Sequence, residues 1–279
     1  MDFRTINTEV LVIGGGVAGL RAAVAAAELG TEVAIVSKPS CASPEIMGFN
    51  APVMPGDSKE LYFSDIEQSG YGINDSRLAM VLSEHVLDEV TYLEGLGLEF
   101  DRDAEGRYLP IHTLGTAYPR LIKTGVSSGS AEMRILKARC GELGVKQYAP
   151  VDILGLLVSR GHVLGAYGLD LGSGELLRFT ASAVVLATGG CGAMQSFSTY
   201  PKALTGDGYA MAYEAGARLT DMEFQQFEPC CFIWPEELSG KVIATTLLRH
   251  GAVLRNGEGR DFLADYGLTR ENAQKGSLA

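Results

Sequence analysis

Three glycines near the N-terminus have the spacing that capture of a dinucleotide phosphate requires. Gly14, Gly16 and Gly19 stand in a GxGxxG pattern. In this pattern the first glycine permits a tight turn, the second lets a phosphate approach bare backbone, and the third lets a helix pack closely on a strand. The N–H groups at the start of that helix, with the helix dipole behind them, then hold a pyrophosphate. The predicted phosphate-binding residues are Gly14, Gly15, Gly16, Val17, Ala18 and Gly19.

The residues on either side of the glycines predict the elements that must position them. An apolar run, Val10–Ile13, leads into the turn, and a second apolar run, Val33–Val36, follows the Ala-rich segment Leu20–Leu29. Gly30 is expected to end that segment as a helix C-cap. Strand, tight turn, helix and strand are the context that a GxGxxG motif needs, so we predict a dinucleotide site. The alternative is a βαβ unit in which the glycines serve packing alone.

The end of the second predicted strand bears on which dinucleotide binds. About twenty residues after the glycines, an NAD-binding chain usually carries Asp or Glu to bind the ribose hydroxyls. This chain has Ser37 and Lys38 there. The residues therefore weaken an NAD interpretation and leave the kind of dinucleotide open at this point.

Composition and charge are those of an ordinary globular protein. The chain has 279 residues, of which 46% are hydrophobic and 20% charged, enough for one large or two modest domains. The net charge of -11, without a run of Lys or Arg, argues against binding to nucleic acid or to an anionic membrane. No apolar run reaches the roughly 18–20 residues of a membrane span. The first strand begins within about ten residues and leaves no room for a signal peptide, so we expect a cytoplasmic protein.

The cysteines lack the spacing of a metal site. No CxxC pair and no nearby set of histidines occurs, so we predict neither a zinc site nor an iron–sulfur cluster. Scattered reduced thiols are the expected state. Redox activity of the adjacent pair Cys230 and Cys231 stays an alternative, although neighbouring cysteines form a disulfide only in a strained ring.

Loops and helical spacing alternate in the next part of the chain. Residues 39–58 are rich in Pro, Ser and Gly and predict a loop beside the first turn. Apolar residues recur at helical spacing from Ser76 to Gly95, and a hairpin is expected around Gly106. The Gly/Ser segment Thr124–Ser130 then precedes a predicted helix. It either approaches a cofactor or is an ordinary helix cap.

The pattern changes to period two between residues 145 and 187. This alternation predicts a β-meander that feeds a buried strand. Ligands of open α/β sheets bind where strands end, so the small residues at the end of that strand are candidate ligand contacts. They are Ala187, Thr188, Gly189 and Gly190. A short helix is expected to begin at Asp207 and to stop at Gly216.

Taken in this order, the segments resemble the N-terminal half of the succinate dehydrogenase, fumarate reductase and L-aspartate oxidase flavoprotein family. The matching segments are VLVIGGGVAGLRAAVAAAELG with VAIVSK, LEFDRDAEGR, SSGSAEM, RGHVLGAYGLDLGSGELLRFTASAVVLATGGCG and LTGDGYAMAYEAGARLTDMEFQQFEP, which cover most of residues 8–230. The resemblance implies an α/β fold with a Rossmann-like FAD-binding domain, a parallel sheet with a β-meander, over residues 1–231. It also implies that this domain is incomplete at its C-terminus and that residues 232–279 begin a capping domain.

The resemblance also assigns cofactor contacts. It implies that Gly14–Gly19 hold the FAD pyrophosphate, that Ser37 and Lys38 lie by the adenosine, and that Ala187–Gly190 pass under the cofactor. Asp207 is implied to contact FAD, a role that is compatible with a plain helix cap. In membrane-complex members of the family, a His in the loop after the second strand carries the flavin covalently. Residues 39–55 contain no His, so we expect FAD to be bound without a covalent bond.

The substrate side departs from the family pattern. The family's QFHP carries a substrate-binding His where this chain has Glu228 in QFEP. An ionised Glu accepts hydrogen bonds and repels carboxylates, which puts a C4-dicarboxylate substrate in doubt. Glu228 either pairs with a cationic or neutral substrate or faces solvent. The predicted substrate-pocket residues are Arg120, Glu228, Thr245 and Arg249, with His250 as a further counterpart, and no catalytic residue is predicted.

The resemblance implies a FAD-dependent oxidoreductase. In the family, hydride passes between flavin N5 and a small organic substrate, and the PRD motif that carries the proton donor follows at about the point where this chain stops. We therefore expect a second polypeptide that completes the flavoprotein, an electron-transfer subunit, or a truncated product. One alternative is a non-catalytic flavin-binding subunit that relays electrons. Another is an NAD-dependent dehydrogenase.

Overall fold

The computed structural model describes residues 3–113, 116–125, 127–227, 230–243, 247 and 252–267. These residues fall into two compact units. The first unit holds Met1–Met47, Gly95–Leu98 and Val126–Gln225. The second holds Gly48–Glu94, Glu99–Gly125 and Gln226–Ala279. Residues 232–279, predicted to begin a capping domain, thus cluster with earlier parts of the chain, and the predicted boundary at residue 231 stays a prediction.

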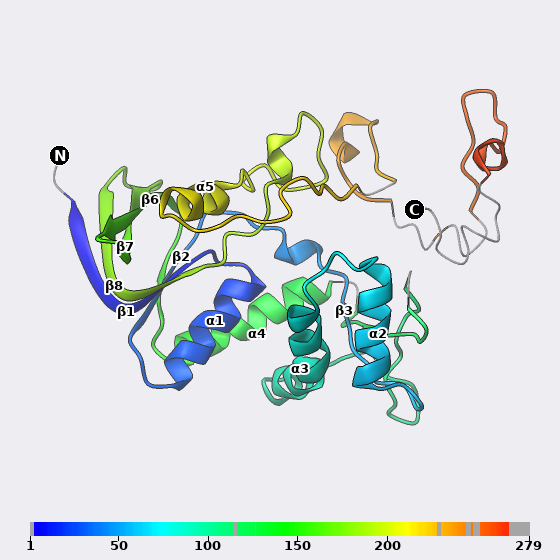
Figure 1. The fold of residues 1–279 in the computed structure, drawn as a ribbon, viewed down its shortest axis with the longest axis horizontal. Coiled ribbons are helices and arrows are strands. Elements are labelled where there is room, and N and C mark those ends of the chain that lie inside the picture. Colours follow the sequence, from blue (N-terminus) through cyan, green and yellow to red (C-terminus); the bar gives the residue numbers. More distant parts are fainter. Residues whose placement is uncertain are drawn as a thin grey trace. The chain divides into compact units, whose positions relative to one another are not determined.

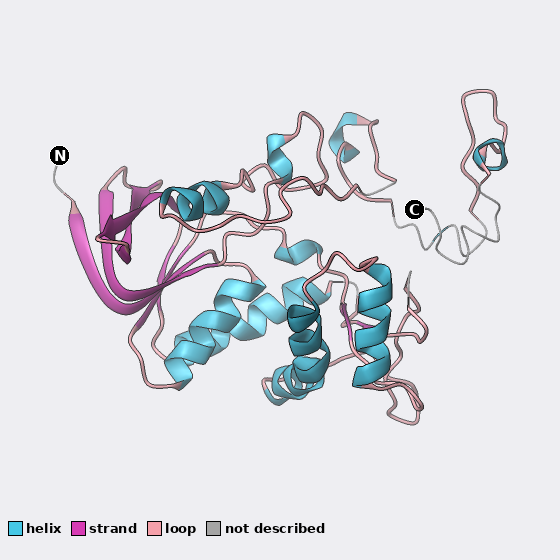
Figure 2. Cartoon of the chain, viewed as in Figure 1, coloured by secondary structure: helices cyan, strands magenta, loops and turns pink. Residues whose placement is uncertain are grey.

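A six-stranded sheet forms the centre of the first unit, with the strand order β5-β2-β1-β8-β7-β6. The strands are β1 (Arg4–Ile13), β2 (Val33–Val36), β5 (Lys146–Tyr148), β6 (Val151–Ser159), β7 (His162–Asp170) and β8 (Leu176–Leu186). β1 pairs in parallel with β2 and with β8, and β2 pairs in parallel with β5. β6, β7 and β8 form an antiparallel meander. The predicted combination of a parallel sheet and a β-meander is confirmed, and the magenta strands of Figure 2 show it.

Three α-helices belong to the first unit: α1 (Val17–Glu28), α4 (Ser128–Glu142) and α5 (Asp207–Glu214). Two short 3₁₀ helices, η1 (Ser43–Glu45) and η2 (Gly192–Met194), lie in its loops. α1 packs on β1, β2 and β8 and also on α4. α5 packs on β6, and Figure 1 shows it on the other side of the sheet from α1 and α4.

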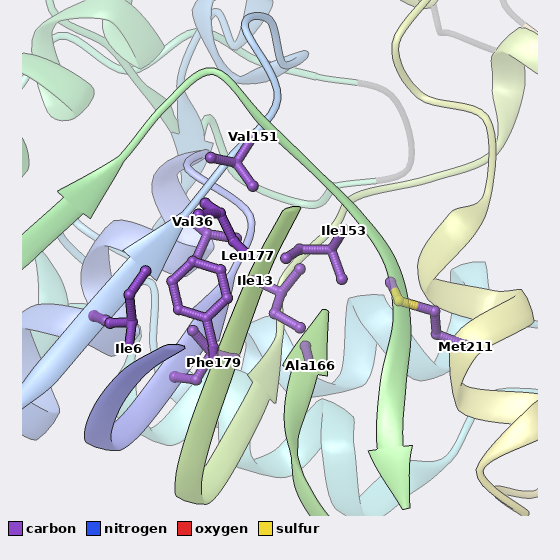
Figure 3. Packing of buried hydrophobic residues seen from close by; sticks show 11 residues of the cluster. Ile6, Ile13, Val36, Val151, Ile153, Ala166, Leu177, Phe179 and Met211 are labelled. Carbon is purple, nitrogen blue, oxygen red and sulfur yellow. The ribbon is translucent and has the colours of Figure 1, made fainter. Parts of the chain in front are cut away.

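The hydrophobic core on the meander side is built from alternate residues of the strands. Because side chains alternate across a strand, Leu11 and Ile13 of β1 share this face with Leu177 and Phe179 of β8. The Phe179 ring meets the Tyr148 ring edge to face, with centroids 5.3 Å apart. The cluster comprises Ile6, Leu11, Ile13, Ala34, Val36, Val151, Ile153, Ala166, Leu177, Phe179 and Met211 (Figure 3). Met211 of α5 belongs to it, so the same core that closes the sheet also anchors α5.

The second unit contains helices α2 (Lys59–Ser69) and α3 (Ser76–Gly95) and a two-stranded antiparallel sheet. Its strands are β3 (Phe49–Asn50) and β4 (Leu121–Ile122). Its 3₁₀ helices are η3 (Glu236–Leu238) and η4 (Leu263–Tyr266). The Phe49 and Phe100 rings pack edge to face at 5.5 Å.

The structure differs from the predicted elements in two places. Helix α2 was not predicted, and Tyr62 is its one buried side chain, so no apolar periodicity marked it. The end of β8 was predicted to be buried, and this is wrong, because Val185 and Leu186 are both 36% exposed. In the described part of the chain, β7 pairs with β8 only up to Thr180, so residues 181–186 have β1 alone as a strand neighbour.

Within the described residues, no helix combines the length and the apolar character that crossing a bilayer requires.

Candidate functional site

The glycine turn between β1 and α1 has the geometry that its spacing predicted. Gly14 has φ +121°, a conformation that side-chain-bearing residues rarely adopt, and a Cβ there would overlap the carbonyl oxygen of Ala187. A Cβ at Gly19 would overlap the carbonyl oxygen of Gly14 and lie 3.3 Å from the Cβ of Ala187. The first glycine therefore permits the turn and the third permits close packing of helix and strand.

The second glycine leaves a bare surface at the start of α1. A Cβ at Gly16 would meet only the hydroxyl of Ser43 closely, at 2.7 Å, and that hydroxyl is the end of a flexible side chain. Ser43 Oγ accepts the backbone N–H of Val17 at 3.0 Å. Ser43 thus satisfies one of the first-turn N–H groups that a helix cannot pair within its own backbone. Sequence reasoning missed this residue, because the serine stands in η1, 26 residues from its partner.

A cavity of about 660 Å³ opens beside this turn, within the first unit. Its size is that of a small-molecule or cofactor site. It is lined by the turn, the loop after β2, the end of β8 and the start of α5. The predicted cofactor-binding residues that line it are Gly14, Gly15, Gly16, Ala18, Ser37, Lys38, Ala187, Thr188, Gly189, Gly190 and Asp207. Val17 and Gly19 are not among the lining residues.

The backbone around Ser37 fixes the cavity wall at the end of β2. The Ser37 N–H donates to the carbonyl of Tyr148 at 3.0 Å, and the Ser37 carbonyl accepts the N–H of Val151 at 2.9 Å. A Cβ at Gly15 would lie 2.7 Å from the Cβ of Ser37, so the turn and the strand end approach closely. Residues far apart in the sequence therefore meet where the predicted site lies.

The end of β8 and the start of α5 also need glycines for their close approach. The N–H of Ala187 donates to the carbonyl of Ile13 at 2.8 Å, which carries the parallel pairing to the rim of the sheet. Gly206 has φ +84° before the helix, and a Cβ at Gly208 would overlap the Thr188 hydroxyl. Asp207 begins α5, as predicted.

Lys38 lies between two carboxylates at this cavity. Its ammonium forms an ion pair with Asp207 and lies 3.4 Å from a carboxylate oxygen of Asp152. Burial opposes the charged ammonium, but the hydrogen bond with Asp207 and the field of both carboxylates outweigh burial and raise the Lys38 pKa. For Asp207, burial opposes ionisation, and its bonds to Lys38 and Thr205 outweigh that cost and lower the Asp207 pKa. The three groups are therefore charged at neutral pH.

Arg120, predicted to line a substrate pocket, lies in the second unit with its side chain 0% exposed. Its guanidinium donates twice to Asp57, at 2.7 Å each, and once to Asp65. It stacks over the Tyr62 ring, with 5.0 Å from the guanidinium carbon to the ring centroid. Arg120 does not line the cavity described above, and its role in a substrate pocket stays a prediction.

The remaining predicted substrate-pocket residues, Glu228, Thr245, Arg249 and His250, lie outside the described residues. Among the described residues no group of three or more His, Cys, Asp or Glu side chains is arranged to hold a metal ion. Cys140 of α4 is fully buried, and this burial raises the pKa of its thiol to about 11.

Comparison with known proteins decides the family. A family model described as FAD binding domain matches residues 9–276 of this chain. The chain belongs to the FAD-binding domain family. The predicted membership is thereby confirmed, and FAD is the cofactor. The residues present fit this cofactor, because the cavity offers bare backbone at Gly16, the N-terminus of α1 and a volume suited to a dinucleotide segment.

Relatives with this FAD-binding domain include enzymes of the predicted group. One polypeptide of the fumarate reductase (CoM/CoB) of Methanothermobacter marburgensis is 33% identical over 287 residues, which cover 100% of this chain and 52% of the relative. L-aspartate oxidase of Caulobacter vibrioides is 30% identical, over 96% of this chain and 54% of the relative. The chain therefore spans about half the length of these relatives.

Solved structures show the same fold. Mycobacterium smegmatis Sdh1 in complex with UQ1 matches with a TM-score of 0.85 and 33% identity, over 94% of this chain and 47% of that one. An E. coli quinol fumarate reductase FrdA variant matches with a TM-score of 0.87 and 29% identity, over 95% and 46%. Both matches cover this chain almost completely and their own chains by half, so they establish the fold of the FAD-binding half.

Proposed function

We propose that this chain is the FAD-binding part of an oxidoreductase related to fumarate reductase and succinate dehydrogenase. The observation that supports this most strongly is the cavity, on which four segments far apart in the sequence converge. These are the glycine turn, Ser37 and Lys38, the end of β8, and the start of α5. Each of these segments was predicted to contact FAD.

Each segment has a proposed part in binding. The N–H groups at the start of α1 hold the pyrophosphate over the bare backbone of Gly16, and the hydroxyl of Ser43 is placed to donate to the same phosphates. Ser37 and Lys38 lie by the adenosine, residues 187–190 pass under the cofactor, and Asp207 contacts it. When bound, FAD supplies two-electron chemistry as a hydride carrier. The absence of His in residues 39–55 supports binding without a covalent bond.

The proposed reaction is hydride transfer between the flavin and a small organic substrate. Arg120, Glu228, Thr245 and Arg249 stay the candidates for the substrate pocket. Glu228 replaces a substrate-binding His of the family, so the substrate is proposed to differ from a C4-dicarboxylate. The same replacement favours a second candidate function, a non-catalytic electron-relay subunit in which the substrate site has been lost.

A partner is part of the proposal. Two of the relatives are named subunits, and this chain spans about half the length of the proteins it matches. We propose that a second polypeptide completes the flavoprotein or accepts its electrons. Co-purification under native conditions, with the released cofactor and any accompanying polypeptide identified, tests this. A partner that carries a PRD-like Arg supports catalysis, whereas a partner that is another redox protein supports the electron relay. A cytoplasmic location stays a prediction.

Replacing Gly16 with valine is expected to weaken FAD binding at least about tenfold, which corresponds to about 1.4 kcal/mol. The added side chain fills the space above the first turn of α1 where the phosphates are proposed to lie. Its one close neighbour is the flexible Ser43 hydroxyl, so the fold is expected to persist. Flavin content after purification and the dissociation constant for added FAD measure the effect.

Gly141→Val is the matched control, because nothing lies within 4 Å of a Cβ at Gly141 of α4. Circular dichroism and the unfolding temperature show whether each variant folds. A folded Gly16→Val protein that binds FAD as tightly as the parent would refute the placement of the pyrophosphate.

A further inference from the structure

Lys38 has no hydrogen-bond donor left for a ligand. A lysine ammonium has three N–H groups. One is bonded to Asp207, one reaches the Thr205 hydroxyl at 3.4 Å, and one faces a carboxylate oxygen of Asp152 at 3.4 Å. Lys38, Asp152, Thr205 and Asp207 together form what we call the Lys38 cluster. All four residues line the cavity.

The position of the Lys38 cluster gives this pairing a consequence for ligand choice. Lys38 comes two residues after β2, the place where dinucleotide-binding folds contact the adenosine ribose. A cation near that place accommodates a 2′-phosphate, whereas a carboxylate there binds a free 2′-hydroxyl. Judged by sequence alone, Lys38 favours a 2′-phosphate. In the structure, one ammonium and two carboxylates give the Lys38 cluster a net charge of about −1, which repels a phosphate.

We propose that Asp152 makes this cavity select against dinucleotides whose adenosine ribose carries a 2′-phosphate. This inference rests on the proposed function, in that Ser37 and Lys38 lie by the adenosine. Asp152 supplies, from β6, the carboxylate that is missing at the end of β2. It acts through Lys38 by occupying one of its donors and by reversing the net charge of the Lys38 cluster.

Asp152, and not Asp207, is the residue on which this selectivity is tested. Asp207 begins α5, bonds with Thr205 and is itself proposed to contact FAD, so its replacement alters several functions together. In the described part of the chain, the side-chain interaction of Asp152 is the ion pair with Lys38. Replacing Asp152 therefore changes the charge beside the ribose and leaves the glycine turn and the start of α5 intact.

The test compares two nucleotides that differ only in the 2′-phosphate, 5′-ADP and 2′,5′-ADP. Each is titrated calorimetrically into FAD-free protein, and the ratio of the two dissociation constants is measured for the parent chain, Asp152→Asn and Asp88→Asn. Asp88 is the matched control, because its side chain is 80% exposed on α3 and its replacement changes the net charge by the same amount.

The parent is expected to bind 5′-ADP more tightly than 2′,5′-ADP. Asp152→Asn is expected to shift the ratio toward 2′,5′-ADP by about tenfold, and Asp88→Asn by less than about twofold. An unchanged ratio in Asp152→Asn, with both nucleotides still bound, overturns the inference and leaves the proposed function standing. Failure of the folded parent to bind either nucleotide overturns both, because no adenosine site is then present.

Discussion

Replacing Arg120 with methionine is expected to lower the free energy of unfolding by about 3–5 kcal/mol. The guanidinium and the Asp57 carboxylate are each 0% exposed, and Asp65 is 14% exposed. Removing the cation leaves two carboxylates without the partner that compensated their loss of water. An uncompensated buried charge costs far more than an exposed ion pair contributes.

Chemical denaturation monitored by circular dichroism measures this loss. Arg107→Met is the matched control, because Arg107 pairs with Asp103 while its own side chain is 70% exposed, and we expect a change below about 1 kcal/mol. A triple variant, Arg120→Met with Asp57→Leu and Asp65→Leu, removes all the charges and is expected to recover most of the lost stability. A loss below about 1 kcal/mol in Arg120→Met would show that the ion cluster is not what holds this region together.

The same variants bear on the predicted role of Arg120 in a substrate pocket. The carbonyl of Arg120 accepts the N–H of Ala51 at 2.9 Å, beside the pairing of β3 with β4. The side chain and the backbone of Arg120 therefore both hold the start of the second unit. If the triple variant folds and its partnered enzyme still turns over substrate, the role of Arg120 is structural.

The sequence predicted those features that depend on local spacing. The roles of Gly14 and Gly19 follow from a few consecutive residues, and the structure has the positive φ and the close backbone approach that their positions require. β2 spans Val33–Val36, the predicted limits, because a short β-branched run between turn residues has no competing pattern. Asp207 was placed at a helix start for the same local reason.

Features that depend on long-range contacts were not predicted. Ser43 caps α1 from a loop 26 residues away, and Asp152 reaches Lys38 from a different strand. No residue spacing encodes such pairs, since they form only when the sheet brings β2 and β6 to one rim. The prediction that Val185 and Leu186 are buried failed for the same reason, because an apolar run shows that a strand exists and not what covers it.

Replacing Glu132 with glutamine is expected to remove a pH-dependent loss of stability. Glu132 lies in α4, is 3% exposed, and its Oε1 atom has no hydrogen-bond partner among the described residues. Burial raises the pKa of this carboxyl to about 7. The folded protein therefore holds a proton that the unfolded chain releases near its ordinary value of 4.5. Stability is highest below that value and falls as the pH rises toward 7.

The size of the effect follows from the pKa difference. A rise from 4.5 to about 7 corresponds to a cost of about 3 kcal/mol once the carboxyl is ionised. Glu132→Gln is therefore expected to match the parent near pH 5 and to exceed it by up to about 3 kcal/mol at pH 8. Denaturant titrations at both pH values measure this difference. Glu142→Gln, on the same helix with its side chain 65% exposed, is the control and is expected to follow the parent at each pH. A Glu132→Gln protein that loses stability between pH 5 and 8 as steeply as the parent would show that this carboxyl is ionised in the folded state at little cost.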